Sequence, residues 1–119
     1  MDIGDFAKKM ENFRKNLSRT NHEYNKRIGR EFVELAKPRT PVDTGLSKES
    51  WWFEHDPEEV TIRNTAEDPN RPGNFYAVFW NYGTRNQTGT QTLQIVANMI
   101  NQKKQEMYEE ELKRAWENA

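Results

Sequence analysis

The stretch Thr40–Trp52, TPVDTGLSKESWW, decides the fold because it separates a long helical pattern from the first strand pattern. Thr40 or Thr44 can cap a short helical turn, and Pro41 suits the first turn of a helix or a tight turn. Gly45 supplies backbone freedom that other residues lack. These features together predict a structural corner that joins a helix to a sheet.

The second half of this corner has a polar run between two apolar positions. Leu46 and Trp51 can point inward while the polar residues between them, Ser47 to Glu49, face outward. We expect Gly45 to take a conformation that a side chain disfavours, and Asp43 to accept hydrogen bonds from nearby donors.

The residues before the corner carry the stripe of an amphipathic helix that stops before Pro38. Asp2 can cap its start. One helix over residues 3–37 would be about 50 Å long at about 1.5 Å per residue, which exceeds the width of a small domain. We predict a long helix, kinked where Thr20–Glu23 resembles a capping box, or else projecting unbroken beyond its core. The stripe consists of Ile3, Phe6, Met10, Phe13, Leu17, Tyr24, Ile28, Phe32 and Leu35.

Strand patterns follow the corner. Residues 51–55 and 60–64 are rich in aromatic and β-branched side chains and flank the turn 56–59, which predicts a β-hairpin. Residues 65–74 have no periodicity and are expected to form a loop. Residues 75–82, FYAVFWNY, are the most apolar run and are interpreted as a central strand ended by Gly83. Alternation along strands then places one member of each aromatic pair, Trp51 with Trp52 and Phe79 with Trp80, in the core and the other on the opposite face.

A second helical stripe begins near Gln91. The order of elements predicts an α+β fold with a long N-terminal helix, a small antiparallel sheet of about three to four strands and a C-terminal helix. A single domain over residues 1–119 is expected, with a helical region at 1–38, a sheet region at 39–84 and the C-terminal helix at 91–118. The second stripe consists of Leu93, Val96, Ala97, Ile100, Met107, Leu112 and Trp116.

Composition restricts the classes of function. Only 34% of the 119 residues are hydrophobic and none is cysteine, so disulfides, thiolate nucleophiles and thiolate zinc sites are excluded. No apolar run approaches the roughly 18 residues of a membrane span, and a soluble, cytoplasmic-type protein is expected. Residues 1–39 carry ten basic and six acidic side chains (10 − 6 = +4), whereas the remainder carries eight and thirteen (8 − 13 = −5). This polarity could guide how copies stack on one another.

No catalytic, cofactor-binding or metal-binding residues are expected. His22 and His55 lie far apart in the sequence and lack the spaced partners of a metal motif. Asp43, Ser47 and Ser50 supply, with His55, the residue types of a hydrolytic triad, but no nucleophile elbow surrounds them. The run 83–90 lacks the lysine of a phosphate loop, and the carboxylates of the EEEL run are expected on a solvated helix.

The alternative hypothesis is a small nucleic-acid-binding or toxin-like ribonuclease domain. Its evidence is a set of basic residues on the N-terminal helix, which could follow a phosphate backbone. Interleaved glutamates and the acidic balance of the whole chain favour a solvated face instead. The basic set consists of Lys8, Lys9, Arg14, Lys15, Arg19, Lys26, Arg27 and Arg30.

The corner residues also carry a family resemblance. A helix, the motif T-P-V-D-T-G followed by Leu, Ser and an aromatic residue, a hairpin, a Y-A block ending in G-T and a C-terminal helix resemble the small neck proteins of tailed phages. That family is typified by the tenth gene product of a lambdoid siphophage and is related to minor tail protein Z. Asn81 stands where the family usually has Glu. The first block comprises Thr40, Pro41, Val42, Asp43, Thr44, Gly45, Leu46, Ser50 and Trp51, and the second comprises Tyr76, Ala77, Phe79, Gly83 and Thr84.

The resemblance implies a structural subunit of the virion neck, head-tail connector or tail-completion apparatus. Such a subunit would assemble in a ring between portal-side connector and tail proteins, and would be found in the virion and, during assembly, in the host cytoplasm. It implies no cofactor, no membrane partner and no specific nucleic-acid binding, although DNA could pass through the ring. The residues that we expect at interfaces between copies are Phe6, Met10, Phe13, Trp52 and Trp80.

Overall fold

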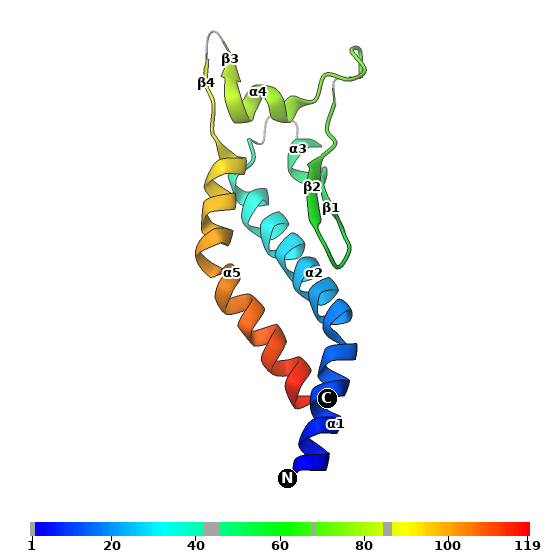
Figure 1. The fold of residues 1–119 in the computed structure, drawn as a ribbon. Helices are drawn as coiled ribbons and strands as arrows, with labels where there is room; N and C mark the ends of the chain where they lie inside the picture. The colour runs from blue at the N-terminus through cyan, green and yellow to red at the C-terminus, as the bar shows by residue number, and fades with distance from the viewer. Residues whose placement is uncertain (1, 42–45, 68, 85–86) are drawn as a thin grey trace.

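The computed structural model describes residues 2–41, 46–67, 69–84 and 87–119 as an elongated molecule (Figure 1). Its principal extents are 68 × 26 × 19 Å and its radius of gyration is 19.3 Å. A compact chain of this length would have a radius of gyration of about 13.5 Å. The difference arises because two long antiparallel helices set the length of the molecule, and its N-terminal helix extends beyond their shared core.

The N-terminal region is helical as predicted, but it is divided at Asn16. Helix α1 spans Ile3–Lys15 and helix α2 spans Leu17–Ala36. The Asp2 carboxylate accepts a 2.7 Å hydrogen bond from Asp5 N–H, which confirms the N-cap. The predicted kink near Thr20 is wrong in position, because the break lies four residues earlier, at Asn16. The predicted capping box at Thr20–Glu23 is also wrong. Thr20 is buried inside α2, where its hydroxyl donates to the Asn16 carbonyl at 3.0 Å.

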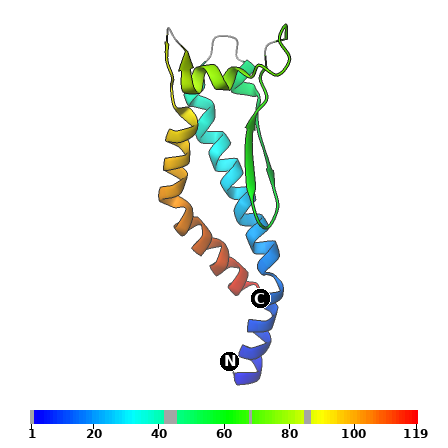
Figure 2. The ribbon, with the colours of Figure 1, turned by 45° about the horizontal axis from the view of Figure 1, so that its top comes forward.

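The corner begins with the 3-10 helix η1 (Lys37–Arg39), in which proline occupies the first turn. Helix α3 (Leu46–Glu49) leads into strand β1 (Trp51–His55), which pairs antiparallel with β2 (Val60–Asn64). The register runs from Trp51 opposite Asn64 to His55 opposite Val60, as a hairpin over these residues requires. Figure 2 shows the hairpin lying along one side of α2.

The predicted central strand at residues 75–82 is wrong. Residues Tyr76–Tyr82 form helix α4, which crosses the end of the molecule opposite the N-terminus (Figure 1). Two short strands follow, β3 (Gly83–Thr84) and β4 (Gln87–Thr88), and they pair with each other. Among the described residues, the strands thus form two separate pairs and not one sheet.

The end of helix α4 is stabilised by hydrogen bonds from residues that lie about ten positions later in the sequence. The last carbonyls of a helix lack partners within it. Here the chain returning toward α5 supplies them, because Thr90 N–H donates to the Trp80 carbonyl at 2.8 Å and Gln91 N–H donates to the Asn81 carbonyl at 2.9 Å. An apolar run of eight residues does not by itself distinguish a buried strand from a short helix.

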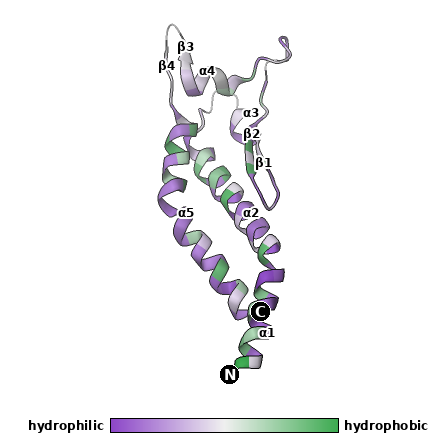
Figure 3. Ribbon diagram, viewed as in Figure 1, coloured by the Kyte–Doolittle hydropathy of each residue, from purple (hydrophilic) through white to green (hydrophobic). Residues whose placement is uncertain are grey.

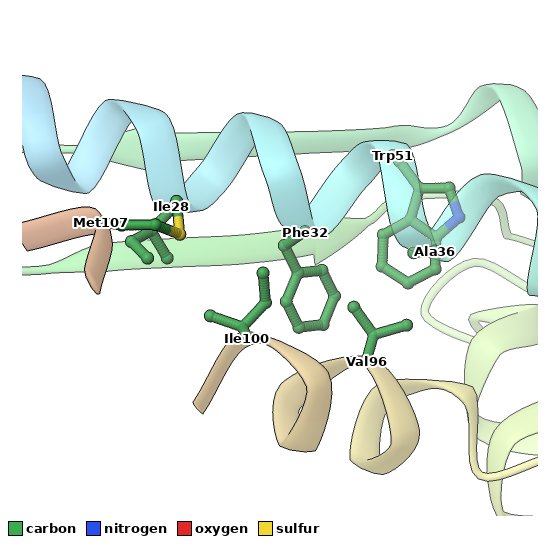
Figure 4. Close-up of a cluster of buried hydrophobic side chains, with 7 residues drawn as sticks. All are labelled: Ile28, Phe32, Ala36, Trp51, Val96, Ile100 and Met107. Atoms are coloured by element: carbon green, nitrogen blue, oxygen red, sulfur yellow. The ribbon is translucent and has the colours of Figure 1, made fainter. Parts of the chain in front are cut away.

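Helix α5 (Thr92–Glu117) confirms the C-terminal helix that the second stripe predicted. It runs antiparallel to α2, and the two helices form the main core (Figure 4). In this cluster one ring and two aliphatic side chains of α2 meet three aliphatic side chains of α5, and Trp51 from β1 closes one end. The fold class is therefore α+β as predicted, with a long helical N-terminal region, a small antiparallel sheet and a C-terminal helix, and with α4 in place of the central strand. The buried cluster consists of Ile28, Phe32, Ala36, Trp51, Val96, Ile100 and Met107.

Gly29 sets the distance between α2 and the hairpin. It is buried in the middle of α2, and a Cβ atom placed on it would lie 2.6 Å from Cγ and 2.7 Å from Cε2 of Phe53 on β1. Atoms that are not bonded do not approach so closely. Glycine at this position allows the Phe53 ring to lie against the backbone of α2.

We predict that Gly29→Ala destabilises the protein although alanine is the better helix former. The helical preference of alanine contributes up to about 1 kcal/mol, whereas forcing a methyl group into a filled interface costs about 1–3 kcal/mol. The matched control is Gly4→Ala on the exposed helix α1, where the nearest atom to the new Cβ would be Asp2 Oδ1 at 3.3 Å. Chemical denaturation should show a loss of stability for Gly29→Ala and none for Gly4→Ala; a Gly29→Ala protein as stable as the Gly4→Ala protein would contradict the packing argument.

Candidate functional site

The corner is held together by the indole of Trp51. Its Nε1–H donates to Thr40 Oγ1 at 2.8 Å, and the Thr40 hydroxyl donates in turn to the Ala36 carbonyl at 2.8 Å. Trp51 and Thr40 are both buried. This chain of two hydrogen bonds joins the first residue of β1 to the last turn of α2, which confirms that the stretch joins the helix to the hairpin.

Aromatic packing extends the corner to α4. The Trp51 ring lies 6.1 Å from the Phe32 ring and 6.0 Å, edge to face, from the Trp80 ring. Trp80 Nε1–H donates to Ser47 Oγ at 3.3 Å, and Asn64 Nδ2 donates to the Ser47 carbonyl at 2.6 Å. Ser47 was expected to face outward but is buried, where both of its oxygens accept hydrogen bonds.

The corner also reaches α5. The buried Thr92 hydroxyl donates to the Arg39 carbonyl at 3.0 Å, which ties the first turn of α5 to η1. Residues 42–45 lie outside the described residues, so the expectations for Asp43 and Gly45 stay predictions. The alternation of the first aromatic pair holds, since Trp51 is 7% exposed and Trp52 is 39% exposed. It does not apply to Phe79 and Trp80, because they are successive residues of a helix and not of a strand.

The second block of the resemblance maps onto α4 and β3. Tyr76, Ala77 and Phe79 lie on α4, while Gly83 and Thr84 form β3. Gly83 has a φ of 91°, in the left-handed region where glycine is favoured, so it can end α4 and turn the chain into β3.

Asn81 is the residue of this block that the structure makes prominent. Its side chain is fully buried, its Oδ1 accepts from Leu93 N–H at 2.8 Å and its Nδ2 donates to Gln94 Oε1 at 3.0 Å. The carboxamide therefore caps the first turn of α5 from another helix, a position where Gln91 provides no side-chain cap. Sequence reasoning missed this role; the signal was a single amide inside an otherwise apolar run.

The two histidines, distant in sequence, meet in the structure. The rings of His22 on α2 and His55 on β1 lie 4.4 Å apart, and His55 Nδ1 is buried without a hydrogen-bond partner among the described residues. Ser50 precedes β1 and His55 ends it, so about 17 Å of extended chain separates them at roughly 3.4 Å per residue. The triad residue types are therefore not brought together at these two positions. Within the described ranges, no group of three His, Cys, Asp or Glu side chains is placed to hold a metal ion.

Asp56 stabilises the turn of the hairpin next to these histidines. Its Oδ1 accepts hydrogen bonds from the N–H groups of Glu59 and Glu58, at 2.9 and 2.7 Å, and these bonds hold the pKa of the Asp56 carboxyl below its usual value. Asn25 of α2 donates to the Asp56 carbonyl at 2.7 Å. The turn is therefore fixed to α2 and carries a carboxylate that stays ionised at neutral pH.

Two basic residues of the N-terminal helices, Lys15 and Arg27, form ion pairs with described residues. Arg27 contacts Glu110 at 2.7 Å and Glu111 at 3.4 Å, and its pKa is raised because Glu110 accepts its hydrogen bond. Glu111, which was expected on a solvated face, is buried and also pairs with Arg114 at 2.9 Å. The bonds that hold α2 to α5 thus compete with any phosphate for Arg27.

Helix α1, at the end of the molecule away from α4, includes turns that Figure 3 colours as hydrophobic, and several of its apolar residues are exposed. Ile3 is 88% exposed, Phe6 49% and Met10 39%, and none of the residues of α1 is buried. Trp116 near the end of α5 contacts Phe6 and Phe13 edge to face, with ring centroids 5.9 and 5.8 Å apart. The other two stripe residues of α1, Ile3 and Met10, are exposed to solvent. No helix in the described part of the chain is long and apolar enough to cross a bilayer.

The exposed apolar positions coincide with part of the interface predicted from the sequence. Phe6, Met10 and Trp52 are exposed, whereas Trp80 is half-buried against Trp51 and Ser47. Comparison of the chain with protein-family models, with curated proteins and with solved structures finds no match. The resemblance to phage neck proteins therefore stays a prediction that depends on the corner motif.

We predict that Asn81→Ala lowers the free energy of unfolding by about 1–3 kcal/mol. The substitution removes the cap of α5 and leaves the Leu93 N–H without an acceptor in a region closed to water. The matched control is Asn98→Ala, because Asn98 is an exposed asparagine on α5. This substitution should change stability by less than about 0.5 kcal/mol. Urea denaturation measures both; equal effects of the two substitutions would show that the Asn81 cap contributes nothing.

Proposed function

We propose that this chain is a structural subunit of a phage or prophage virion, acting at the neck in head-tail joining or tail completion. The observation that carries the proposal is the exposed apolar stripe of α1 on an arm that extends beyond the α2–α5 core. A monomer gains nothing by keeping Ile3, Phe6 and Met10 in water, and exposed apolar clusters of this kind mark interaction sites.

The shape of the molecule supports assembly with other copies. An arm at one end and a different exposed surface elsewhere suit a head-to-tail contact, and such contacts close into rings when the rotation between subunits allows it. The corner motif, T-P-V-D-T-G with the following Leu, Ser and Trp, supplies the likeness to neck proteins specifically. In the structure Thr40, Ser47 and Trp51 of this region are occupied with holding the fold together.

The hydrogen-bonding pattern around the corner agrees with an architectural role. Ser47 accepts from Trp80 and Asn64, and Thr40 links Trp51 to α2. A nucleophile needs a neighbouring base, whereas these hydroxyls are paired with indole and backbone groups. The nucleic-acid alternative has less support, since Arg27 is paired with two glutamates and Lys15 with Glu11.

Inactivation of the gene in the phage or prophage that carries it tests the proposal. The expected result is a lysate that contains filled heads and separate tails by electron microscopy, with infectivity restored by the wild-type gene supplied in trans. A silent substitution in the same codon serves as the control for effects on neighbouring genes. Joined, infectious virions from the inactivated phage would overturn the proposal.

A further inference from the structure

The β1–β2 hairpin has one covered face and one open face. Helix α2 packs against the face that contains Trp51 and Phe53, and strand alternation places Trp52 and Glu54 on the other side. Trp52 is 39% exposed, and the Arg63 guanidinium from the paired position on β2 lies 5.8 Å from its ring. Two-stranded hairpins are marginal alone, so a second covering layer on the open face would stabilise this one.

The open hairpin and α1 carry opposite charges. Residues 51–64 contain four acidic residues and one basic residue (1 − 4 = −3), and the acidic ones gather at or near the turn. Helix α1, residues 3–15, contains four basic and two acidic residues (4 − 2 = +2). The hairpin carboxylates, all exposed, are Glu54, Asp56, Glu58 and Glu59, and the basic residues of α1 are Lys8, Lys9, Arg14 and Lys15.

One sector of α1 is left free by its own chain. Phe6, Lys9 and Phe13 turn toward Trp116, whose ring lies 5.0 Å from Lys9 Nζ. At about 100° per residue, Ile3, Ala7 and Met10 occupy a neighbouring sector roughly 60° wide, and all three are exposed. By the same geometry Arg14 lies within this sector, between Ile3 and Ala7. The free sector is therefore an exposed apolar strip that contains one basic side chain.

We propose that this free sector of α1 from one copy packs across the open face of the β1–β2 hairpin of a second copy. Apolar side chains of α1 would cover Trp52, while Arg14 would meet the carboxylates of the hairpin. The contact would bury the exposed apolar strip and give the hairpin its second layer. The inference rests on the proposed self-assembly, and it assigns the two surfaces that meet.

The arm-to-hairpin contact joins two different surfaces, which is the arrangement that a closed ring requires. Pairing of α1 with α1 would be isologous and would stop at two copies. It would also leave the acidic hairpin face uncovered. Charge complementarity therefore favours the hairpin as the surface that receives α1.

Because the chain has no cysteine, engineered cysteines can report the contact directly. We would prepare Ala7→Cys as one protein and Glu54→Cys as another with a different affinity tag, mix them, and apply a short thiol-to-thiol crosslinker. The expected product is a mixed dimer of arm and hairpin proteins, with yield falling as ionic strength rises because the charges are exposed. The same pair would be crosslinked inside cells that are assembling virions.

Two control pairs show whether the contact is specific. Ala7→Cys mixed with Glu106→Cys, an exposed position on α5, should remain uncrosslinked, as should Ala7→Cys alone. Dimers of Ala7→Cys with itself in place of the mixed dimer would support α1–α1 pairing and overturn the proposal. Absence of the mixed dimer both in purified protein and in assembling cells would overturn it as well.

Charge reversal gives an independent measurement. The triple change Glu54→Lys, Glu58→Lys and Glu59→Lys should abolish association with a wild-type arm, and Lys8→Glu with Arg14→Glu on the arm should restore it. Each variant is expected to fold because all five positions are exposed, and circular dichroism checks this. If copies associate through other surfaces, this inference fails while the neck proposal stands; if the crosslink forms but gene inactivation leaves virions joined, the neck proposal fails alone.

Discussion

The buried indole of Trp51 is the constraint on which the arrangement of the elements depends. A tryptophan removed from water needs an acceptor for its N–H, and Thr40 Oγ1 provides one 2.8 Å away. The same Thr40 hydroxyl donates its own hydrogen to the Ala36 carbonyl at the end of α2. One threonine hydroxyl therefore links the end of α2 to the start of β1. Trp80 of α4 packs against the same indole ring.

The low content of apolar residues explains the elongated shape. The core lies between α2 and α5, with Trp51 at one end, and contains no residue of α1. Few apolar side chains are therefore left to pack against α1. At the far end Trp116 contacts Phe6 and Phe13, while Ile3 stays in solvent. Elements with few buried contacts open most readily, so α1, in which no residue is buried, is expected to open more readily than α2 or α5.

Much of this arrangement could be predicted from the sequence because the dominant signals are local. The steps of three and four gave both long helices, and alternation placed Trp51 inside and Trp52 outside. The helix break at Asn16 was not predicted because it is a change in backbone hydrogen bonding, which the side-chain pattern does not show. The Asn16 N–H is shared between the carbonyls of Asn12 and Phe13. Thr20 resembled a cap, yet its hydroxyl satisfies a carbonyl one turn earlier.

The features that escaped prediction depend on contacts between distant residues. The residues of helix α4 were interpreted as a strand because they form a short apolar run. Their terminal carbonyls accept from Thr90 and Gln91, and no local pattern reveals these partners. Asn81 caps α5 across twelve residues of chain, and His22 meets His55 only because the hairpin folds back on α2. Gly29 likewise has no role until the Phe53 ring lies on it. Single-sequence patterns report periodicity, whereas these roles require the tertiary arrangement.

The most direct test of the account is a double-mutant cycle between Trp51→Phe and Thr40→Val, measured by urea denaturation. The cycle cancels the loss of the Thr40 bond to Ala36 and isolates the coupling between the indole N–H and the threonine hydroxyl. A hydrogen bond that holds the corner predicts a coupling energy of about 0.5–1.5 kcal/mol. Additive effects of the two substitutions, within about 0.3 kcal/mol, would contradict the claim that this bond fixes α2 to the hairpin.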